Sequence, residues 1–99
     1  MSVFLVVKAI VPENIVKDFD TWYENYHLHE AHSAFKSISA FRGWVNSNQH
    51  HAFYEFKDLD TANSLFASDQ LNIMIREFDN KWNGKVTRTR DLINIVQKI

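Results

Sequence analysis

The sequence predicts a single α+β domain in which a four-stranded antiparallel sheet carries helices on one face. Two observations lead to this prediction. Four stretches with the apolar pattern of strands are interleaved with two stretches of helical spacing, in the order β-α-β-β-α-β. The 99 residues include one proline and two glycines, so no segment has the composition of a linker. We therefore expect residues 1–99 to form one domain.

The four expected strands are recognised by different patterns. Residues 3–11 are apolar at both alternating positions and end at Pro12, which has no N–H to donate to a sheet. Residues 38–45 and 51–56 flank a polar tetrapeptide, and this arrangement predicts an antiparallel hairpin. Residues 86–96 form the last expected strand.

The first expected helix covers residues 14–35 and combines an apolar face with a row of side chains that can move protons. The predicted buried face consists of residues at helical spacing, Ile15, Phe19, Trp22 and Tyr26. The adjoining flank carries a row at i, i+4 and i, i+3 spacing, Tyr23, His27 and Glu30. The periodicity loosens between Tyr26 and Ala31, where we expect a kink or break.

The second helical region begins at a capping aspartate, either Asp58 or Asp60. Its predicted buried positions repeat at i+4, i+3 and i+4, as Leu71, Ile75, Phe78 and Trp82. Asn83-Gly84 then provides a helix stop. This order of elements is the split β-α-β, or ferredoxin-like, arrangement.

The face of the sheet without helices is expected to be covered rather than wet. A sheet that faces water on one side alternates apolar with polar residues, whereas residues 3–11 are apolar at both parities and Tyr54 and Phe56 alternate with Phe53. A second copy of the chain, packed sheet to sheet about a twofold axis, would cover this face. We therefore expect a homodimer that closes into an α/β barrel.

Composition excludes several classes of function. The formal net charge of −1 leaves no basic surplus for a phosphate backbone. The absence of cysteine excludes disulfides, thiolate nucleophiles and iron–sulfur clusters. The apolar N-terminal run is too short to span a bilayer, and it lacks the cationic start and cleavage site of a signal peptide. The sequence thus predicts a cytoplasmic protein with no membrane partner.

His27 is the candidate general base, because a neutral imidazole can accept a proton near pH 7 and return it. Tyr23, one turn earlier, is the candidate donor to a developing oxyanion, and Glu30, one turn later, is the candidate group to orient the imidazole. The alternative is a histidine on the helix surface that forms a hydrogen bond with Glu30.

Three arginines, Arg42, Arg88 and Arg90, lie in otherwise apolar strands, where an unpaired charge is costly. Arg42 is the candidate to polarise a substrate oxygen together with Tyr23, and Arg90 is a candidate ligand contact. The alternative is that these charges form salt bridges or protect an edge strand. The other candidate ligand-binding residues are Trp22, Trp44, His51 and Tyr54, although aromatic residues in strands also suit a plain core.

The histidine cluster of the first helix also suggests a metal site. His-Glu-Ala-His at residues 29–32 is one residue shorter than the His-Glu-x-x-His zinc motif. His27 projects from a different side of a regular helix than His29, so the cluster cannot converge on one ion without a break. Even with His50 or His51 added, we predict no metal and no cofactor.

The first helix also carries a motif, Phe19-x-x-Trp22-Tyr23-x-x-x-His27. It resembles the aromatic-then-histidine pattern on the first helix of several dimeric α/β-barrel proteins. This superfamily includes cofactor-free monooxygenases, EthD-like proteins, muconolactone isomerases, sugar mutarotases and polyketide cyclases. Residues 42–44, 51–56 and 88–90 resemble an uncharacterised bacterial group of the same superfamily. The chain departs from the EthD-type pattern because Leu28-His29 replaces a proline soon after the histidine.

The resemblance implies a ferredoxin-like fold, a homodimer and a cleft between sheet and helices in which His27 meets a small carbonyl or phenolic compound. The function that we predict is binding, or cofactor-independent transformation, of an aromatic or polyketide-like compound. Such a transformation would be of monooxygenase, isomerase or cyclase type. Each of these reactions begins with removal of a proton next to a carbonyl or from a phenol.

Two alternative functions remain open. The same element order belongs to the RNA-recognition motif, and residues 51–56 resemble part of the stretch that stacks RNA bases. The negative net charge and the missing glycine and leading basic residue of that stretch argue against single-stranded RNA binding. The other alternative is a dimerisation module without catalysis.

Overall fold

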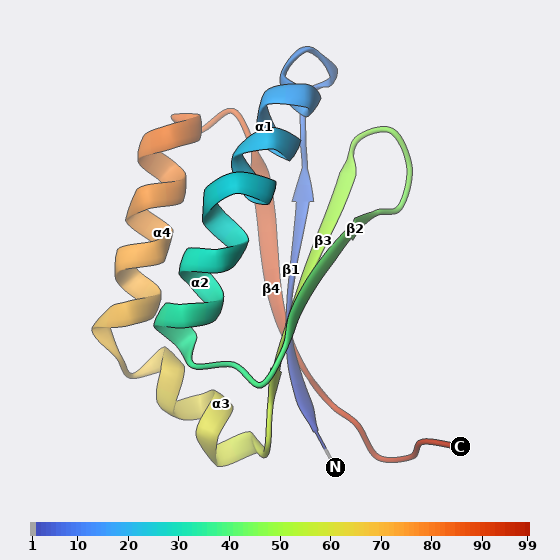
Figure 1. Cartoon of the computed structure of the whole chain (residues 1–99), viewed down its shortest axis with the longest axis vertical. Coiled ribbons are helices and arrows are strands. Elements are labelled where there is room, and N and C mark those ends of the chain that lie inside the picture. The colour runs from blue at the N-terminus through green and yellow to red at the C-terminus, as the bar shows by residue number, and fades with distance from the viewer. Residues whose placement is uncertain (1) are drawn as a thin grey trace.

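The computed structural model describes residues 2–99 as one four-stranded sheet with every helix on the same face (Figure 1). The strands are β1 (Val3–Ile10), β2 (Ala40–Trp44), β3 (Gln49–Phe56) and β4 (Thr87–Asn94). They lie in the order β2-β3-β1-β4, and each neighbouring pair is antiparallel. The α+β fold class and the ferredoxin-like order of elements are confirmed.

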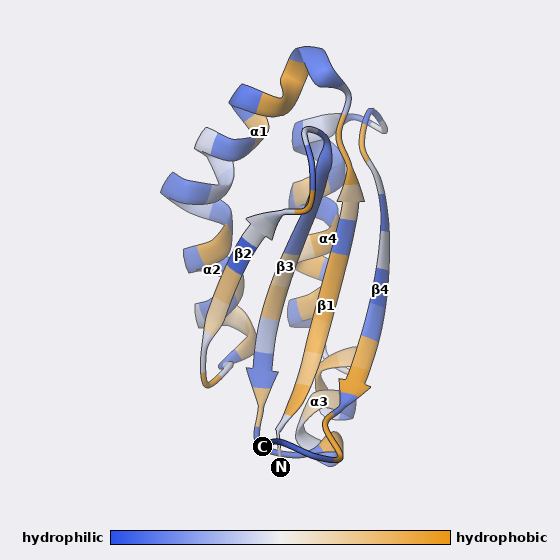
Figure 2. Cartoon of the chain, turned by 90° about the vertical axis from the view of Figure 1, so that its right-hand side faces the viewer, coloured by the Kyte–Doolittle hydropathy of each residue, from blue (hydrophilic) through white to orange (hydrophobic). Residues whose placement is uncertain are grey.

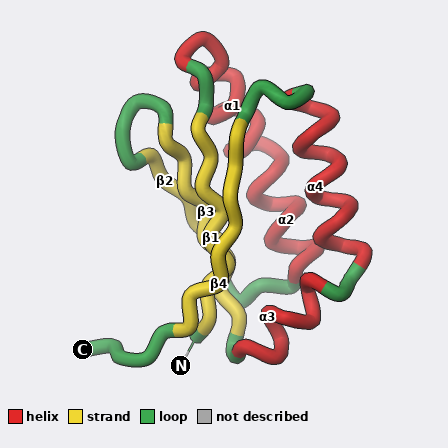
Figure 3. Tube along the Cα trace, turned by 180° about the vertical axis from the view of Figure 1, so that it is seen from behind, coloured by secondary structure: helices red, strands yellow, loops and turns green. Residues whose placement is uncertain are grey.

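The helical layer has more pieces than the sequence predicts. A 3₁₀ turn (Glu13–Ile15), α1 (Val16–Trp22), a π-helical turn called η2 (Tyr23–His27) and α2 (Leu28–Phe35) follow β1 without interruption. The second region is split into α3 (Leu59–Phe66) and α4 (Asp69–Trp82). Seen from behind, all of these segments stand on one side of the sheet (Figure 3).

Local signals explain the boundaries of the second region. Asp58 is the cap of α3: its carboxylate accepts hydrogen bonds from the backbone N–H of Thr61 at 2.8 Å and from the Thr61 hydroxyl at 2.6 Å. Asn83 adopts the left-handed conformation, with φ 50°, and ends α4. The loop between β2 and β3 is shorter than expected, because β3 begins at Gln49 rather than at the predicted His51. The carbonyl of Gln49 accepts a hydrogen bond from the backbone N–H of Val45.

The π-helical turn changes which face of the first helix is buried. Phe19, Tyr23 and His27 are buried, whereas Tyr26 is 58% exposed and Trp22 is half-buried. A regular α-helix has about 3.6 residues per turn, so side chains four residues apart do not point in the same direction but are rotated slightly round the helix axis. The π-helical turn contains more residues and offsets part of this rotation, so Phe19, Tyr23 and His27 all point toward the sheet. The predicted buried face was therefore wrong at Tyr26, and the helix irregularity begins before the predicted kink.

Strand register defines the two faces of the sheet. Leu5 pairs with Tyr54 and Leu92, and Ala9 pairs with His50 and Arg88, so these residues share one face. This face meets the helices and forms the core. Along α4 the buried positions are Leu71, Met74, Phe78 and Trp82, so Met74 takes the place predicted for Ile75, which is only half-buried.

The opposite face of the sheet carries no helix and is rich in apolar side chains, as Figure 2 shows along β1 and the end of β4. The apolar residues on this face are Phe4, Val6, Phe41, Phe53, Ile93 and Ile95, which together surround a shallow hollow of about 240 Å³. We call this set the open-face patch. Phe41 is 48% exposed and stacks on Phe53 with ring centroids 4.9 Å apart.

Candidate functional site

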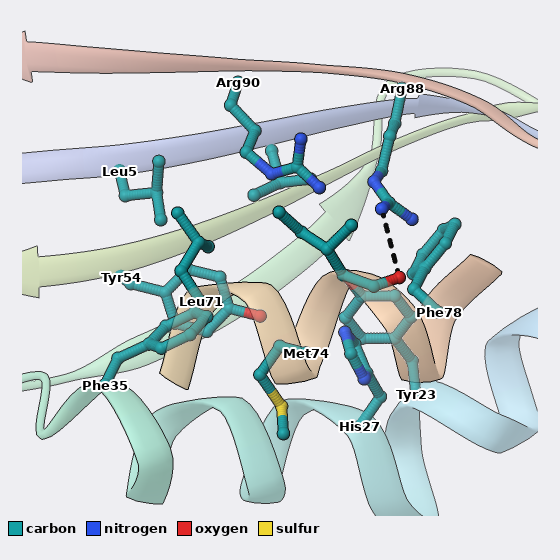
Figure 4. Close-up of a pocket in the computed structure, with 12 residues that line it drawn as sticks. Leu5, Tyr23, His27, Phe35, Tyr54, Leu71, Met74, Phe78, Arg88 and Arg90 are labelled. Atoms are coloured by element: carbon teal, nitrogen blue, oxygen red, sulfur yellow. Dashed lines mark hydrogen bonds between the residues drawn. The ribbon is translucent and has the colours of Figure 1, made fainter. Parts of the chain in front are cut away.

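A small cavity lies between the sheet and the helices, next to the π-helical turn (Figure 4). Its volume is about 30 Å³, which is close to the share of one water molecule in the liquid. Most of its lining is apolar, but five side chains carry polar groups: Tyr23, His27, Tyr54, Arg88 and Arg90. Four of these five come from the sequence-predicted set, and Arg88 is the addition.

His27 is held in this wall by aromatic packing. Its ring stacks on Trp22 with centroids 4.3 Å apart and an interplanar angle of 15°, and meets Tyr23 edge to face at 4.8 Å. The side chain is 6% exposed, and no residue of the described chain accepts from or donates to its Nδ1. Burial, aided by the positive charge of Arg88, lowers the pKa of His27 to about 4. The imidazole is therefore neutral at pH 7 and has a free ring nitrogen.

Arg88 brings a buried positive charge to the same cavity. Its guanidinium lies 3.8 Å above the ring of Phe78, and one of its nitrogens is 3.1 Å from a carboxylate oxygen of Asp79. The other terminal nitrogen is buried without an acceptor within residues 2–99. Arg90 stands next to it on β4, and burial together with the charge of Arg88 lowers the pKa of Arg90. Two neighbouring guanidiniums and one carboxylate, whose side chain is 63% exposed, form a site that favours an anion.

Two tyrosine hydroxyls complete the polar wall. Burial raises the pKa of Tyr23 to about 12, and a hydrogen bond from Tyr54 opposes part of this rise. Burial also raises the pKa of Tyr54 well above its usual value. Both hydroxyls therefore keep their protons at neutral pH and serve as hydrogen-bond donors rather than bases.

Arg42 lies elsewhere, in a cluster at the other edge of the sheet. A terminal nitrogen of Arg42 and the indole N–H of Trp44 both donate to the same oxygen of Asp20, each at 2.8 Å. These two hydrogen bonds lower the pKa of the Asp20 carboxyl. His50 completes the cluster, with its Nε2 3.3 Å from Arg42. Arg42 and Trp44 are thus absent from the cavity lining, and the structure supports the ion-pair alternative for Arg42.

The remaining candidate residues of the sequence analysis do not line the cavity. His51 lies on the face of the sheet without helices, beside Lys8. Trp22 is separated from the cavity by His27 and lines an outer groove. Glu30 does not orient His27: it is exposed, and Nδ1 of His27 has no hydrogen-bond partner within residues 2–99. Burial and the nearby carboxylate of Glu77 raise the pKa of Glu30. His32 lies with its Nδ1 2.6 Å from the hydroxyl of Ser37.

The described chain offers no ready metal centre. Within residues 2–99, no three or more histidine, aspartate or glutamate side chains are grouped so that they could hold an ion. The same residues include no helix with the length and apolarity needed to cross a bilayer.

Removing the Asp20 carboxylate should destabilise the fold without affecting the cavity. Asp20→Ala leaves donors of Arg42 and Trp44 without their acceptor, which costs about 1 kcal/mol of unfolding free energy because water reaches the site. Urea denaturation measures this loss, with Asp18→Ala as the control at an exposed carboxylate two residues earlier. Equal stability of the two variants would contradict the ion-pair interpretation.

Acid should unfold the protein through its two buried histidines. Burial lowers the pKa of His27 to about 4 and of His50 to about 3, whereas histidine in an unfolded chain titrates near 6.5. Between these values the unfolded chain binds protons that the native chain does not, so each histidine lowers the unfolding free energy by about 1.4 kcal/mol per pH unit as pH falls. Stability should therefore be complete above pH 6.5 and decline steeply below it.

Urea denaturation at several pH values between 7.5 and 4.5 checks this decline. His27→Phe should reduce the slope of unfolding free energy against pH by the contribution of one proton, about 1.4 kcal/mol per pH unit. His29→Phe, at an exposed position, should leave this slope unchanged. A slope that is the same in wild type and His27→Phe would show that His27 is not the buried titrating group.

Comparisons with known proteins establish the fold. Neither a known family model nor a curated protein sequence matches the chain. An ethyl tert-butyl ether D (EthD) family protein from Bacillus halodurans has a similar structure, with a TM-score of 0.76 and 16% identity over 97% of this chain and 100% of its own. SnoaB, a cofactor-independent oxygenase from Streptomyces nogalater, superposes with a TM-score of 0.67 and 13% identity, over 99% and 96% of the two chains.

A dimeric ferredoxin-like protein from an uncultured marine organism is also similar, with a TM-score of 0.68 and 11% identity over 99% of this chain and 98% of its own. At these identities the likeness concerns the path of the backbone. It places the chain in the ferredoxin-like α/β fold, near EthD-like and SnoaB-like proteins.

Proposed function

We propose that the cavity between sheet and helices binds a small organic molecule with a carbonyl or phenol group, and that His27 removes its acidic proton without a cofactor. The observation that carries this proposal is a pair of unpartnered, buried polar atoms on two side chains that line the cavity, one from the helical layer and one from the sheet (Figure 4). One is Nδ1 of His27, and the other is a terminal nitrogen of Arg88. Buried polar groups usually have a hydrogen-bond partner, so a molecule that enters the cavity would gain from binding both atoms.

The proposed chemistry is proton transfer coupled to oxyanion stabilisation. His27 takes a proton from the carbon next to a carbonyl, and the electron pair of the broken C–H bond forms an enolate. The enolate oxygen is stabilised by the guanidinium of Arg88 and by the protonated hydroxyl of Tyr23. The imidazolium then returns the proton. Oxygenation, isomerisation and cyclisation all pass through such an anion, and the cofactor-independent oxygenase among the structural neighbours is consistent with this chemistry.

The cavity must open before such a molecule can enter. Sites for small organic ligands measure about 300–1,000 Å³, against about 30 Å³ for this cavity. The side chains that can make room are those of Met74, Ile75 and Arg90, on α4 and β4. Met74 is unbranched and adapts easily, and the other two are only half-buried. In this proposal the structure corresponds to a closed form of the cavity.

Proton exchange tests the proposal without knowledge of the natural substrate. In D₂O, the wild-type protein should accelerate replacement of the acidic C–H hydrogens of 2-tetralone, an aromatic ketone, as followed by ¹H NMR. The rate should exceed that of free imidazole at the same concentration. Exchange no faster than with imidazole, at millimolar 2-tetralone, would overturn the proposal.

We also propose that two copies of the chain pack through the open-face patch. The patch is apolar, and within it Phe41 is 48% and Ile93 45% exposed in the single chain. Exposed apolar patches mark interaction sites. A similar structure is that of a dimeric ferredoxin-like protein. A twofold dimer through the sheets would bury the patch against itself.

RNA binding would compete for the same face, but the charges on it argue against that function. Around the aromatic residues, Lys8 is balanced by Glu55 and Asp91, which lie on the same side of the sheet by register. Phe41 and Phe53 stack on each other rather than standing apart for bases. Without a basic surplus there is no gain from counterion release.

A further inference from the structure

A second hollow lies between α1 and the C-terminal end of α4, separate from the cavity. This outer groove has a volume of about 420 Å³, within the range of about 300–1,000 Å³ that is typical of small-molecule sites. Its lining combines aromatic and basic side chains: Trp22, Tyr26 and Trp82 with Lys17, Lys81 and Lys85. No sequence motif pointed to this groove, because its residues come from distant parts of the chain.

The groove has a surplus of positive charge. Three lysines line it against one carboxylate, that of Asp18. None of these lysines has a carboxylate partner within 4 Å in residues 2–99. The end of α4 carries a partial negative charge that offsets part of this field, but Lys17 belongs to α1 and lies outside that helix end. An anion would therefore find three ammonium groups without a carboxylate partner, one of which, that of Lys81, lies over the Trp82 ring at 5.5 Å from its centroid.

The aromatic residues of the groove supply flat surfaces beside these charges. Tyr26 is 58% exposed, and Trp22 is half-buried with its ring held edge to face against Trp82, at 5.5 Å. Large, exposed aromatic side chains are costly to leave in water and favour contact with another ring. Ring surface and cationic groups thus occur together, which is the combination that an aromatic anion requires.

We propose that the outer groove binds a small aromatic anion, with its ring against Trp22 and Tyr26 and its negative group held by Lys17, Lys81 and Lys85. This site does not depend on the chemistry proposed for His27. Trp22 nevertheless stacks on His27, so in this proposal the Trp22 ring lies between the bound molecule and His27.

Titration with 1-naphthoate and its neutral counterpart 1-naphthamide tests this proposal. ¹H–¹⁵N spectra of the indole N–H groups should show shifts of Trp22 and Trp82 with naphthoate. The Lys17→Ala/Lys81→Ala double variant should weaken naphthoate binding by about ten-fold, or about three-fold per lysine. Binding of naphthamide should be weaker and should not respond to the same substitutions. Lys57→Ala, at an exposed lysine outside the groove, is the matched control.

Salt gives a second readout, because screening weakens exposed charge interactions. Raising the ionic strength from 50 mM to 500 mM should weaken binding of naphthoate and leave binding of naphthamide unchanged. The proposal is overturned if the two compounds bind equally, if Lys57→Ala has the effect of the groove variants, or if Trp22 and Trp82 do not shift. Circular dichroism confirms that each variant is folded.

Discussion

Introducing glutamate at two positions of the open-face patch should convert the dimer that we propose into a monomer. Phe41 and Phe53 stack on each other at the centre of this patch. In a twofold interface each substitution occurs twice, so Phe41→Glu/Phe53→Glu removes four rings and buries four carboxylates. Full burial of an exposed phenylalanine contributes about 1.5–3 kcal/mol, and these rings are already about half-buried in the single chain, so the four rings together contribute about 4 kcal/mol. The dissociation constant should therefore rise by about 10³-fold, and burial of the carboxylates adds to this rise.

Sedimentation equilibrium at micromolar concentration measures this change directly. Phe66→Glu is the matched control, because Phe66 is similarly exposed, at 45%, but lies at the end of α3 in the helix layer. It should leave the dimer intact. A wild-type protein that is monomeric at these concentrations would contradict the prediction, as would a double variant that remains dimeric. If the wild-type monomer bound single-stranded RNA with steep salt dependence, the open face would serve the RNA-binding alternative.

The sequence was sufficient to predict the order of the strands and helices because strong local signals mark them. Pro12 ends the first strand, the Asp58 side chain caps α3, and Asn83 ends α4 in the left-handed conformation. Each signal acts through neighbouring backbone groups, so it is visible without knowledge of the tertiary structure.

The π-helical turn could not be predicted, because it results from packing rather than from local preference. A regular helix with the spacing of Ile15, Phe19, Trp22 and Tyr26 has a satisfactory apolar face. The fold instead buries Tyr23 and His27 next to His50, with the Tyr23 and His50 rings 4.4 Å apart. Contacts with aromatic and imidazole side chains of the sheet therefore determine which face of the helix is buried.

The arginines show a second limit of sequence analysis. Alternation along a strand indicates that Arg88 and Arg90 share one face of the sheet, but not which face. The strand register places Arg42, Arg88 and Arg90 on the face that meets the helices. Alternation also does not indicate at which edge of the sheet each strand lies. In the order β2-β3-β1-β4, Arg42 is at one edge beside α1, while Arg88 and Arg90 are at the other beside α4. Arg88 and Arg90 line the cavity and Arg42 does not, so the function that we propose gives Arg88 the role that the sequence analysis gave to Arg42.

Replacing His27 by phenylalanine should abolish proton exchange while the protein remains folded. Phenylalanine keeps a flat ring against Trp22 and removes the nitrogen that would accept the proton. Loss of a general base reduces rates by about 10²–10⁴-fold, so exchange of 2-tetralone should fall to the background rate. Because the buried imidazole has an unpartnered nitrogen, an apolar replacement should not lower the unfolding free energy at pH 7.5.

Two further variants separate catalysis from stability in the same assay. His29→Phe changes an exposed histidine two residues away and should retain full exchange activity. Arg88→Met should slow exchange by about 10²-fold through loss of oxyanion stabilisation. It should also reduce stability, because Arg88 links β4 to Asp79 of α4. If His27→Phe retains wild-type exchange, or if it loses exchange only together with its melting transition, then His27 is a packing residue and the buried imidazole has no part in catalysis.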